Sequence, residues 1–190
     1  AIDDVLQRTL IGLDGLALVV HPTNDVAGLS ALQLRDLYAG EVLDWVQVGG
    51  EEGEILLVSR EEGSGSRVTF ETRVMGETPV SLTAVVMPTS ADVVEYIMKT
   101  PQAIGYVSRA FVRELLDDDP ANDAAVGVRI LAVEGELPTA DTLVQQRYFL
   151  VQPLYLVTPN VPTGRVRQFL DFILSPAGQE IVARYHAPVR

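Results

Sequence analysis

The feature that most constrains the fold is the run at residues 55–71, where an apolar segment passes through a glycine- and serine-rich turn into a helix-compatible pattern. The turn reads Gly-Ser-Gly-Ser at residues 63–66, and an arginine flanks it on each side, at positions 60 and 67. A strand that feeds such a turn into a helix leaves several backbone N–H groups unpaired and converging on one point. The run therefore predicts a strand–turn–helix unit with the geometry to hold an anion.

The side chains of this turn suit the same purpose. Ser64 and Ser66 each offer a hydroxyl donor, and Gly65 lets the backbone approach a ligand closely. Arg60 adds a forked, charge-assisted donor, and each such bond contributes roughly 1.5–3 kcal/mol net. Arg67 lies in the first helical turn, where the helix dipole disfavours a cation unless an anion is nearby. Two interpretations of the serines stay open, as ordinary helix N-caps or as ligands of an anion.

Strand-like and helix-like segments alternate along the chain, which predicts an α/β fold with mostly parallel strands. Ser30 with Gln33 forms a capping-box pattern, and Gly40 supplies the stop of that helix. Pro176 follows Ser175 at the favoured first position of the last helix. Strands are predicted at residues 16–20, 55–59, 84–87, 104–107, 128–133 and 148–158, and helices at residues 30–38, 64–75, 90–99, 166–173 and from 176 onward.

Composition excludes several classes of partner. The formal net charge of −12 argues against nucleic acid and anionic membranes, which reward a basic surface. A small anion remains compatible, because a helix terminus with an arginine outweighs distant, screened charges. The absence of cysteine excludes disulfides, iron–sulfur clusters and thiol chemistry. No apolar run approaches the roughly 18–20 residues that span a bilayer, and the acidic start at residues 1–4 is unlike a signal peptide.

The sequence gives little support for a catalytic function. A serine hydrolase needs a base, but His21 and His186 are expected at the surface or in packing, and the glycine spacing is not that of a nucleophile elbow. A nucleotide phosphate loop needs a lysine after its glycines, and the single lysine is Lys99. The acidic run at 117–119 is expected to be a solvated loop rather than a cation site, so no metal or cofactor is expected. Three aromatic side chains are expected to pack rather than to line a pocket: Tyr38, Trp45 and Tyr106.

The run at residues 59–67, with Phe70 and Glu71, resembles the second-lobe anion motif of phosphate-binding proteins, the substrate-binding components of phosphate ABC transporters. Proteins of that family have a type 2 periplasmic-binding fold, in which two α/β lobes are joined by hinge crossings. The resemblance covers essentially the whole chain. It continues through residues 13–22, 32–40, 44–45, 102–108, 153–157 and 175–180.

The resemblance implies that Arg60, Ser64, Gly65 and Ser66 contact a tetrahedral oxyanion from one lobe. Ser66 stands where the family more often has threonine, which keeps the hydroxyl and loses a methyl group. Arg67 matches a common arginine of the motif.

The motif's acidic position is taken by Glu62. In some family members this residue orients the arginine, and the competing interpretation is a solvated turn carboxylate.

The resemblance also implies two lobes, the first at residues 1–53 plus 149–190 and the second at residues 54–148. Family members normally begin with a strand, a serine- or threonine-bearing turn, a helix and an aspartate-bearing segment that supply the first lobe's half of the site. This chain starts after those parts, so the first lobe is expected to be incomplete. Trimming, a naturally short relative, or completion by another chain such as a second copy would each account for it.

The function implied is non-catalytic capture of inorganic phosphate or a similar oxyanion, without a cofactor, for delivery to the membrane subunits of an ABC transporter. The location implied is extracytoplasmic, in the periplasm or at the cell surface, with lipid anchoring before trimming. Hinge closure between the lobes would bury the anion. The main alternative is a sensory or interaction domain that kept the fold and lost tight anion binding. A phosphate-handling enzyme is a third interpretation, and it would require turnover that depends on Ser64.

Overall fold

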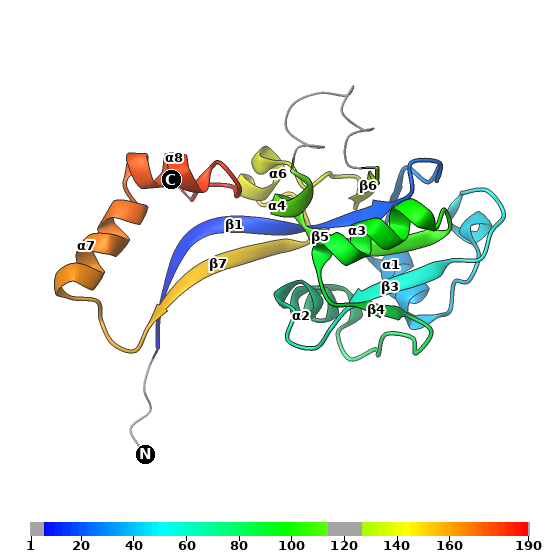
Figure 1. Cartoon of the computed structure of the whole chain (residues 1–190), viewed down its shortest axis with the longest axis horizontal. Helices are drawn as coiled ribbons and strands as arrows, with labels where there is room; N and C mark the ends of the chain where they lie inside the picture. The colour runs from blue at the N-terminus through cyan, green and yellow to red at the C-terminus, as the bar shows by residue number, and fades with distance from the viewer. Residues whose placement is uncertain (1–5, 114–126, 190) are drawn as a thin grey trace, which may run out of the picture.

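The computed structural model describes residues 6–113 and 127–189, which form a seven-stranded sheet with helices packed around it (Figure 1). Helices and strands alternate along the chain as predicted. Their bounds are β1 (Gln7–Val20), β2 (Gly28–Leu29), α1 (Ala31–Ala39), η1 (Trp45–Val48), β3 (Leu56–Arg60), α2 (Gly65–Phe70), η2 (Glu71–Met75), β4 (Val85–Met87), α3 (Ser90–Lys99), β5 (Ala103–Ser108), α4 (Arg109–Val112), β6 (Arg129–Val133), α6 (Ala140–Val144), β7 (Val151–Thr158), α7 (Gly164–Ile173) and α8 (Pro176–Val182).

The sheet is mixed, so the prediction of mostly parallel strands is wrong. The strand order is β2-β6-β1-β5-β3-β4, and β7 also pairs with β1. Strand β1 runs antiparallel to β5, β6 and β7, whereas the pairs β2–β6, β3–β4 and β3–β5 are parallel. Helices connect β3 to β4 and β4 to β5, and such crossovers return the chain in the same direction. No crossover of this kind links β1 to its neighbours, which come from distant parts of the sequence.

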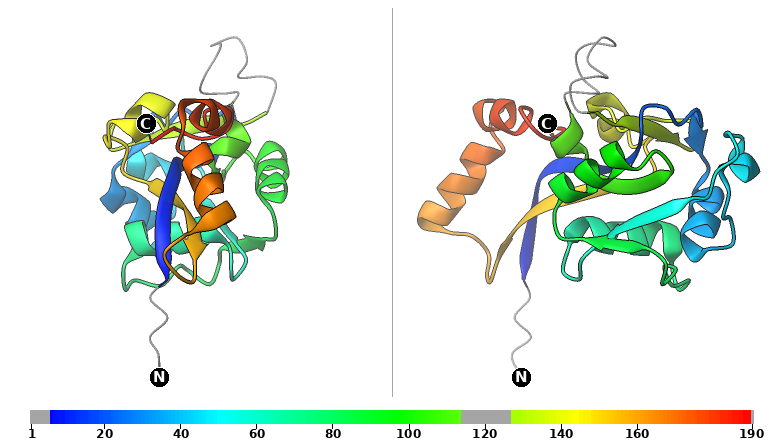
Figure 2. Two further views of the ribbon diagram at one scale, coloured as in Figure 1. Left: turned by 90° about the vertical axis from the view of Figure 1, so that its left-hand side faces the viewer. Right: turned by 45° about the vertical axis from the view of Figure 1, so that its right-hand side comes forward.

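The central strand β1 changes partners half-way along its length. Its first part pairs with β7 as far as the Gly15–Val151 pair, and its second part, from Leu16, pairs with β5 and then also with β6. We call the paired residues 7–15 and 151–158 the ribbon. The ribbon projects from the rest of the sheet and leads to α7 and α8 (Figures 1 and 2). One strand thus belongs to both the ribbon and the main sheet.

The buried residues of β1 supply two separate hydrophobic cores. Leu16 and Leu18 join the larger cluster, while Ala17 and Val19 join the smaller one on the other face. This division follows from the strand geometry, in which successive side chains point to opposite faces. All of residues 16–20 are fully buried, as their continuous apolar run predicts.

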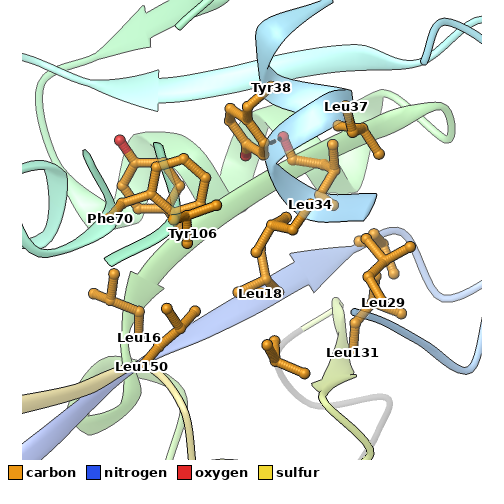
Figure 3. Packing of buried hydrophobic residues seen from close by; sticks show 14 of the residues in the cluster. Leu16, Leu18, Leu29, Leu34, Leu37, Tyr38, Phe70, Tyr106, Leu131 and Leu150 are labelled. Atoms are coloured by element: carbon orange, nitrogen blue, oxygen red, sulfur yellow. Dashed lines mark hydrogen bonds between the residues drawn. The ribbon is translucent and has the colours of Figure 1, made fainter. Parts of the chain in front are cut away.

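Three aromatic rings join α1, α2 and β5 in the larger core (Figure 3). Phe70 stacks on Tyr106 with ring centroids 4.3 Å apart, and Tyr38 lies 4.5 Å from Phe70. The Tyr38 hydroxyl donates to the carbonyl oxygens of Val58 and Ile104, at 3.1 and 3.3 Å. Since Phe70 ends α2, this packing fixes the helix behind the glycine- and serine-rich turn.

Helix ends follow the capping signals in the sequence. The reciprocal hydrogen bonds of Ser30 and Gln33 confirm the capping box of α1, and Gly40 ends that helix at a φ of 81°. Ser175 caps α8, whose first residue is Pro176. The helix predicted at 64–75 is two elements, because α2 continues into the π-helical turn η2.

The division into lobes at residues 1–53 plus 149–190 and 54–148 stays a prediction. The sheet and the larger core both include residues from each set. Tyr38 of the first set packs on Phe70 and Tyr106 of the second.

Candidate anion-binding site

The turn between β3 and α2 is built by one glycine and one serine. Gly63 has a φ of +88°, which is a left-handed conformation. This conformation is unfavourable for any residue with a Cβ, but not for glycine. Ser64 follows as the N-cap of α2, and its backbone N–H donates to the carbonyl of Glu61 at 3.3 Å. The turn therefore places residue 65 at the very start of the helix, directly after the strand end at Arg60.

Two backbone amides at this helix start have no hydrogen-bond partner among the described residues. The Ser64 hydroxyl accepts from the Arg67 amide at 3.4 Å, and the Ser64 carbonyl accepts from the Val68 amide at 3.0 Å. The amides of Gly65 and Ser66 make no such bond within the described ranges, as expected for the first turn of a helix. The side chain of Ser64 is thus an N-cap, and since its hydroxyl only accepts in that bond, its own O–H remains able to donate to an anion.

Ser66 also has a side-chain hydroxyl that is available as a donor. The Ser66 hydroxyl makes no hydrogen bond to any described residue, although Ser66 is only 9% exposed. Gly65 itself is exposed. Two adjacent N–H groups and one hydroxyl, next to the positive end of a helix, are the donors that an oxyanion requires.

Arg60 is fastened to the protein by a set of hydrogen bonds. Its Nε donates to the Met87 carbonyl at 3.2 Å, and its Nη1 donates to the Ser90 hydroxyl at 3.1 Å. Its Nη2 donates to the Pro88 carbonyl at 3.0 Å and to the Glu61 carboxylate at 3.1 Å. A guanidinium has five N–H donors, so one N–H of Nη1 remains beyond these bonds. Arg60 therefore joins the ends of β3 and β4 to α3 and brings a positive charge to the motif.

Arg67 reaches back from α2 to the strand end. Its Nε donates to the Glu71 carboxylate at 2.8 Å, and its Nη1 donates to the Arg60 carbonyl at 3.1 Å. The hydrogen bond to Glu71 raises the pKa of Arg67, so the cation persists at any physiological pH. The acid that pairs with Arg60 is Glu61, whereas Glu62 is exposed.

The ribbon contributes a residue that sequence reasoning missed. A Cβ added at Gly65 would lie 3.1 Å from Nε2 of Gln152, which belongs to β7. An amide nitrogen of the ribbon therefore lies beside Gly65, the first residue of α2. The sequence signal was a polar residue between Val151 and Pro153 near the start of the strand.

The other candidate residues, His21, His186 and the aromatic side chains, make contacts within the protein itself. The hydroxyl of Thr23 lies 2.8 Å from Nδ1 of His21, and Nδ1 of His186 lies 3.8 Å from the buried Asp14 carboxylate. The packing expected of Tyr38, Trp45 and Tyr106 is confirmed, because all three are buried. The indole N–H of Trp45 donates to a backbone carbonyl, and Trp45 also lines a small cavity, which was not expected. The acidic run at 117–119 lies outside the described residues.

Neither a metal site nor a membrane-spanning helix is found within the described ranges. Across residues 6–113 and 127–189, no cluster of three or more His, Cys, Asp or Glu side chains has the arrangement of a metal site. Over the same residues, no helix has both the length and the hydropathy needed to cross a membrane.

Comparison with known proteins places this geometry in a family. The family model described as "PBP superfamily domain" matches residues 3–177. The chain belongs to the PBP superfamily. The type 2 periplasmic-binding-protein-like α/β fold and the resemblance to phosphate-binding proteins of phosphate ABC transporters, both expected from the sequence, are thereby confirmed.

Among its relatives in the PBP superfamily, the phosphate-binding protein PstS of Borreliella burgdorferi is 26% identical over 189 residues. A Clostridium perfringens structure with bound phosphate is 29% identical with a TM-score of 0.80, and it covers 97% of this chain and 72% of that one. An ABC-type phosphate transport receptor of Vibrio cholerae is 27% identical with a TM-score of 0.79 at the same coverage. The match to PstS covers 95% of this chain, which spans 65% of the relative's length.

Proposed function

We propose that the chain is the anion-holding part of a non-catalytic solute-binding protein that captures inorganic phosphate or a similar oxyanion. The observation that carries this proposal is a set of three donors without a hydrogen-bond partner within residues 6–113 and 127–189: the amides of Gly65 and Ser66 and the Ser66 hydroxyl. The solved relatives support it, because one holds bound phosphate and another is a phosphate transport receptor.

Each residue of the motif has a distinct role in the proposed site. The Gly65 and Ser66 amides and the Ser66 hydroxyl donate to the anion, while Ser64 fixes the helix start. Arg60 supplies positive charge and its remaining N–H. Arg67, held by Glu71 and by the Arg60 carbonyl, adds a second cation to the proposed site.

The proposed setting is extracytoplasmic, and the proposed recipients of the anion are the membrane subunits of an ABC transporter. Two lobes, at residues 1–53 plus 149–190 and 54–148, would close over the anion and dehydrate it. Gln152 of the ribbon, beside Gly65, would donate its amide N–H to the enclosed anion.

Titration calorimetry tests the proposal with phosphate, sulfate and tungstate, on residues 1–190 and on the complete product of the gene. We expect heat of binding with phosphate, and an affinity about tenfold lower in Ser66→Ala, because one hydrogen bond to a charged group is lost. Thr69→Ala, one turn further along α2, is the control and should bind as the parent does. Silence with all three anions in the complete product would contradict the proposal and favour a sensory or interaction domain.

A further inference from the structure

Tyr106 of β5 is fully buried, and its hydroxyl contacts the last residues of β3. The phenol oxygen lies 2.8 Å from the Ser59 hydroxyl, a hydrogen-bond distance at which either group can donate. Burial raises the pKa of Tyr106, whereas the Ser59 hydroxyl and the backbone of Arg60 act to lower it. A donor directed at the phenol oxygen has this lowering effect, so the Arg60 amide lies beside the same hydroxyl.

Tyrosine hydroxyls hold β3 where its backbone pairing with β5 ends. Among the described residues, the pairing of the two strands stops at Leu57. One residue later, the Val58 carbonyl accepts a hydrogen bond from the Tyr38 hydroxyl at 3.1 Å, and the next residue, Ser59, is bonded to Tyr106. Of the two tyrosines, Tyr106 therefore acts closer to the glycine- and serine-rich turn.

The ring of Tyr106 contacts the other side of that turn. Phe70, the last residue of α2, stacks on Tyr106 with ring centroids 4.3 Å apart and ring planes 6° apart (Figure 3). The ion pair of Arg67 and Glu71 also acts on the Tyr106 hydroxyl, since Glu71 raises and Arg67 lowers the pKa of the phenol. One side chain thus contacts the strand through its hydroxyl and the helix through its ring.

Given the function proposed above, we propose that Tyr106 is a positioning residue of the anion site, which fixes α2 relative to the end of β3 and thereby aims the Gly65 and Ser66 amides. Within the described residues these amides have no hydrogen-bond partner, so the placement of α2 sets their direction. Hydrogen bonds weaken steeply as their angle departs from linear. A small rotation of α2 therefore lowers the affinity for an anion without unfolding the protein.

Titration calorimetry with phosphate tests Tyr106→Phe, which keeps the ring and removes the hydroxyl. We expect the affinity to fall between about threefold and tenfold. Tyr38→Phe is the matched control, because Tyr38 is equally buried and its hydroxyl donates to two backbone carbonyls. It should lower the Tm at least as much as Tyr106→Phe and change the affinity less than about twofold. Equal losses of affinity in both variants, or unchanged affinity in Tyr106→Phe, would overturn the inference.

A double-mutant cycle tests the contact through which the hydroxyl acts. Ser59→Ala removes the hydrogen-bond partner of Tyr106 and should weaken phosphate binding about as much as Tyr106→Phe does. Because the two groups form one bond, the double variant should bind no more than about twofold more weakly than either single variant. Losses that multiply would show that the two hydroxyls act separately and would overturn the assigned role.

Hydrogen exchange without phosphate distinguishes this inference from the proposed function. At the start of α2, the amides of Arg67 and Val68 donate to the hydroxyl and the carbonyl of Ser64. We expect both amides to exchange at least about tenfold faster in Tyr106→Phe than in the parent, and less than about threefold faster in Tyr38→Phe. If exchange differs in this way and the parent binds no anion, the proposed function fails and the positioning of α2 by Tyr106 stands. Unchanged exchange in Tyr106→Phe would overturn the inference, whether or not the parent binds phosphate.

Discussion

Oδ2 of Asp14 accepts a hydrogen bond from the Ser108 hydroxyl at 2.6 Å, at the point where β1 exchanges β7 for β5 as its neighbour. Oδ1 of the same carboxylate accepts from the amides of Gly15 and Ala110, at 2.8 and 3.3 Å. Nδ1 of His186 lies 3.8 Å from Oδ2. One buried carboxylate therefore connects the ribbon, the start of α4 and the segment that follows α8.

The Asp14 carboxylate should make stability depend on acid pH. Burial acts to raise its pKa, but the nearby His186 ring and the hydrogen bonds from Ser108 and Gly15 outweigh burial and leave the pKa below its usual value. The folded-state pKa lies below the unfolded value, so the Asp14 carboxylate makes its full contribution to stability above about pH 4. That contribution is lost as the pH falls through the folded pKa. We expect Asp14→Asn to lower the free energy of unfolding by about 1–3 kcal/mol at pH 7.

Urea denaturation between pH 7 and pH 3 measures this effect. The difference between the parent and Asp14→Asn should narrow below about pH 4, where the unfolded carboxylate binds a proton more readily than the native one. Asp141→Asn, at an exposed position of α6, is the control and should show little change. A difference that stays constant down to pH 3 would contradict the assigned role.

Ser66→Ala and Ser64→Ala should separate anion binding from helix capping. Ser66→Ala removes a hydroxyl that has no hydrogen-bond partner among the described residues, so we expect phosphate affinity to fall about tenfold with the Tm unchanged. Ser64→Ala removes the N-cap of α2 and should cost about 1 kcal/mol of stability as well. Calorimetric titration and thermal unfolding of both variants check this, and equal stability losses would count against the division of roles.

The two arginines should differ in what their removal costs. Arg60→Ala breaks bonds to Met87, Pro88 and Ser90, so we expect the free energy of unfolding to fall by about 2 kcal/mol in addition to weaker anion binding. Arg67→Ala breaks a partly exposed ion pair and should cost less than about 1 kcal/mol. Chemical denaturation of both variants is the measurement, and a larger loss for Arg67→Ala would be inconsistent with the hydrogen-bond pattern.

Gly63→Ala should disturb the site through the backbone alone. A Cβ at Gly63 would meet no atom within 4 Å, but the residue has a φ of +88°. We expect a loss of about 1 kcal/mol in stability and a weaker affinity for phosphate, because the turn that aims the amides must relax. Gly49→Ala has the same strain and equally open surroundings, at a φ of +92°. It should destabilise by a similar amount and leave phosphate affinity intact, and reduced affinity in both variants would point to general destabilisation.

Gln152→Ala tests the contribution of the ribbon. If the Gln152 amide donates to the anion, its loss should lower phosphate affinity between about threefold and tenfold. Gln168→Ala, on the exposed surface of α7, is the matched control and should bind normally. Unchanged affinity in Gln152→Ala would remove the ribbon from the site and leave the α2 motif as its main part.

Local sequence signals predicted most elements because those signals act over a few residues. The capping box of Ser30, the stop at Gly40 and the start at Pro176 each depend on neighbours within one turn, and all three appear in the structure. The length of β1 was underestimated because residues 7–15 combine polar residues and glycines, which lack the continuous apolar run of residues 16–20. Their strand conformation depends on β7, which lies more than a hundred residues away in the sequence.

In the candidate site, too, the sequence predicts local features but not contacts between distant segments. The turn at 63–66 and the arginines beside it follow from a local pattern, so the sequence places them together. The fastening of Arg60 to Met87, Pro88 and Ser90 depends on how β4 and α3 meet β3. The position of Gln152 depends on the course of the ribbon. No spacing in the chain encodes either relationship.

If Arg60 contacts the anion as proposed, its anchoring would also affect how quickly and how tightly the anion is taken up. Four neighbouring oxygens already hold the Arg60 guanidinium in place. The conformational entropy of this side chain was therefore lost when the protein folded. An arriving anion therefore incurs little of the ordering entropy that usually opposes association. Such preorganisation favours recognition limited by diffusion and dehydration rather than by a search among side-chain conformers.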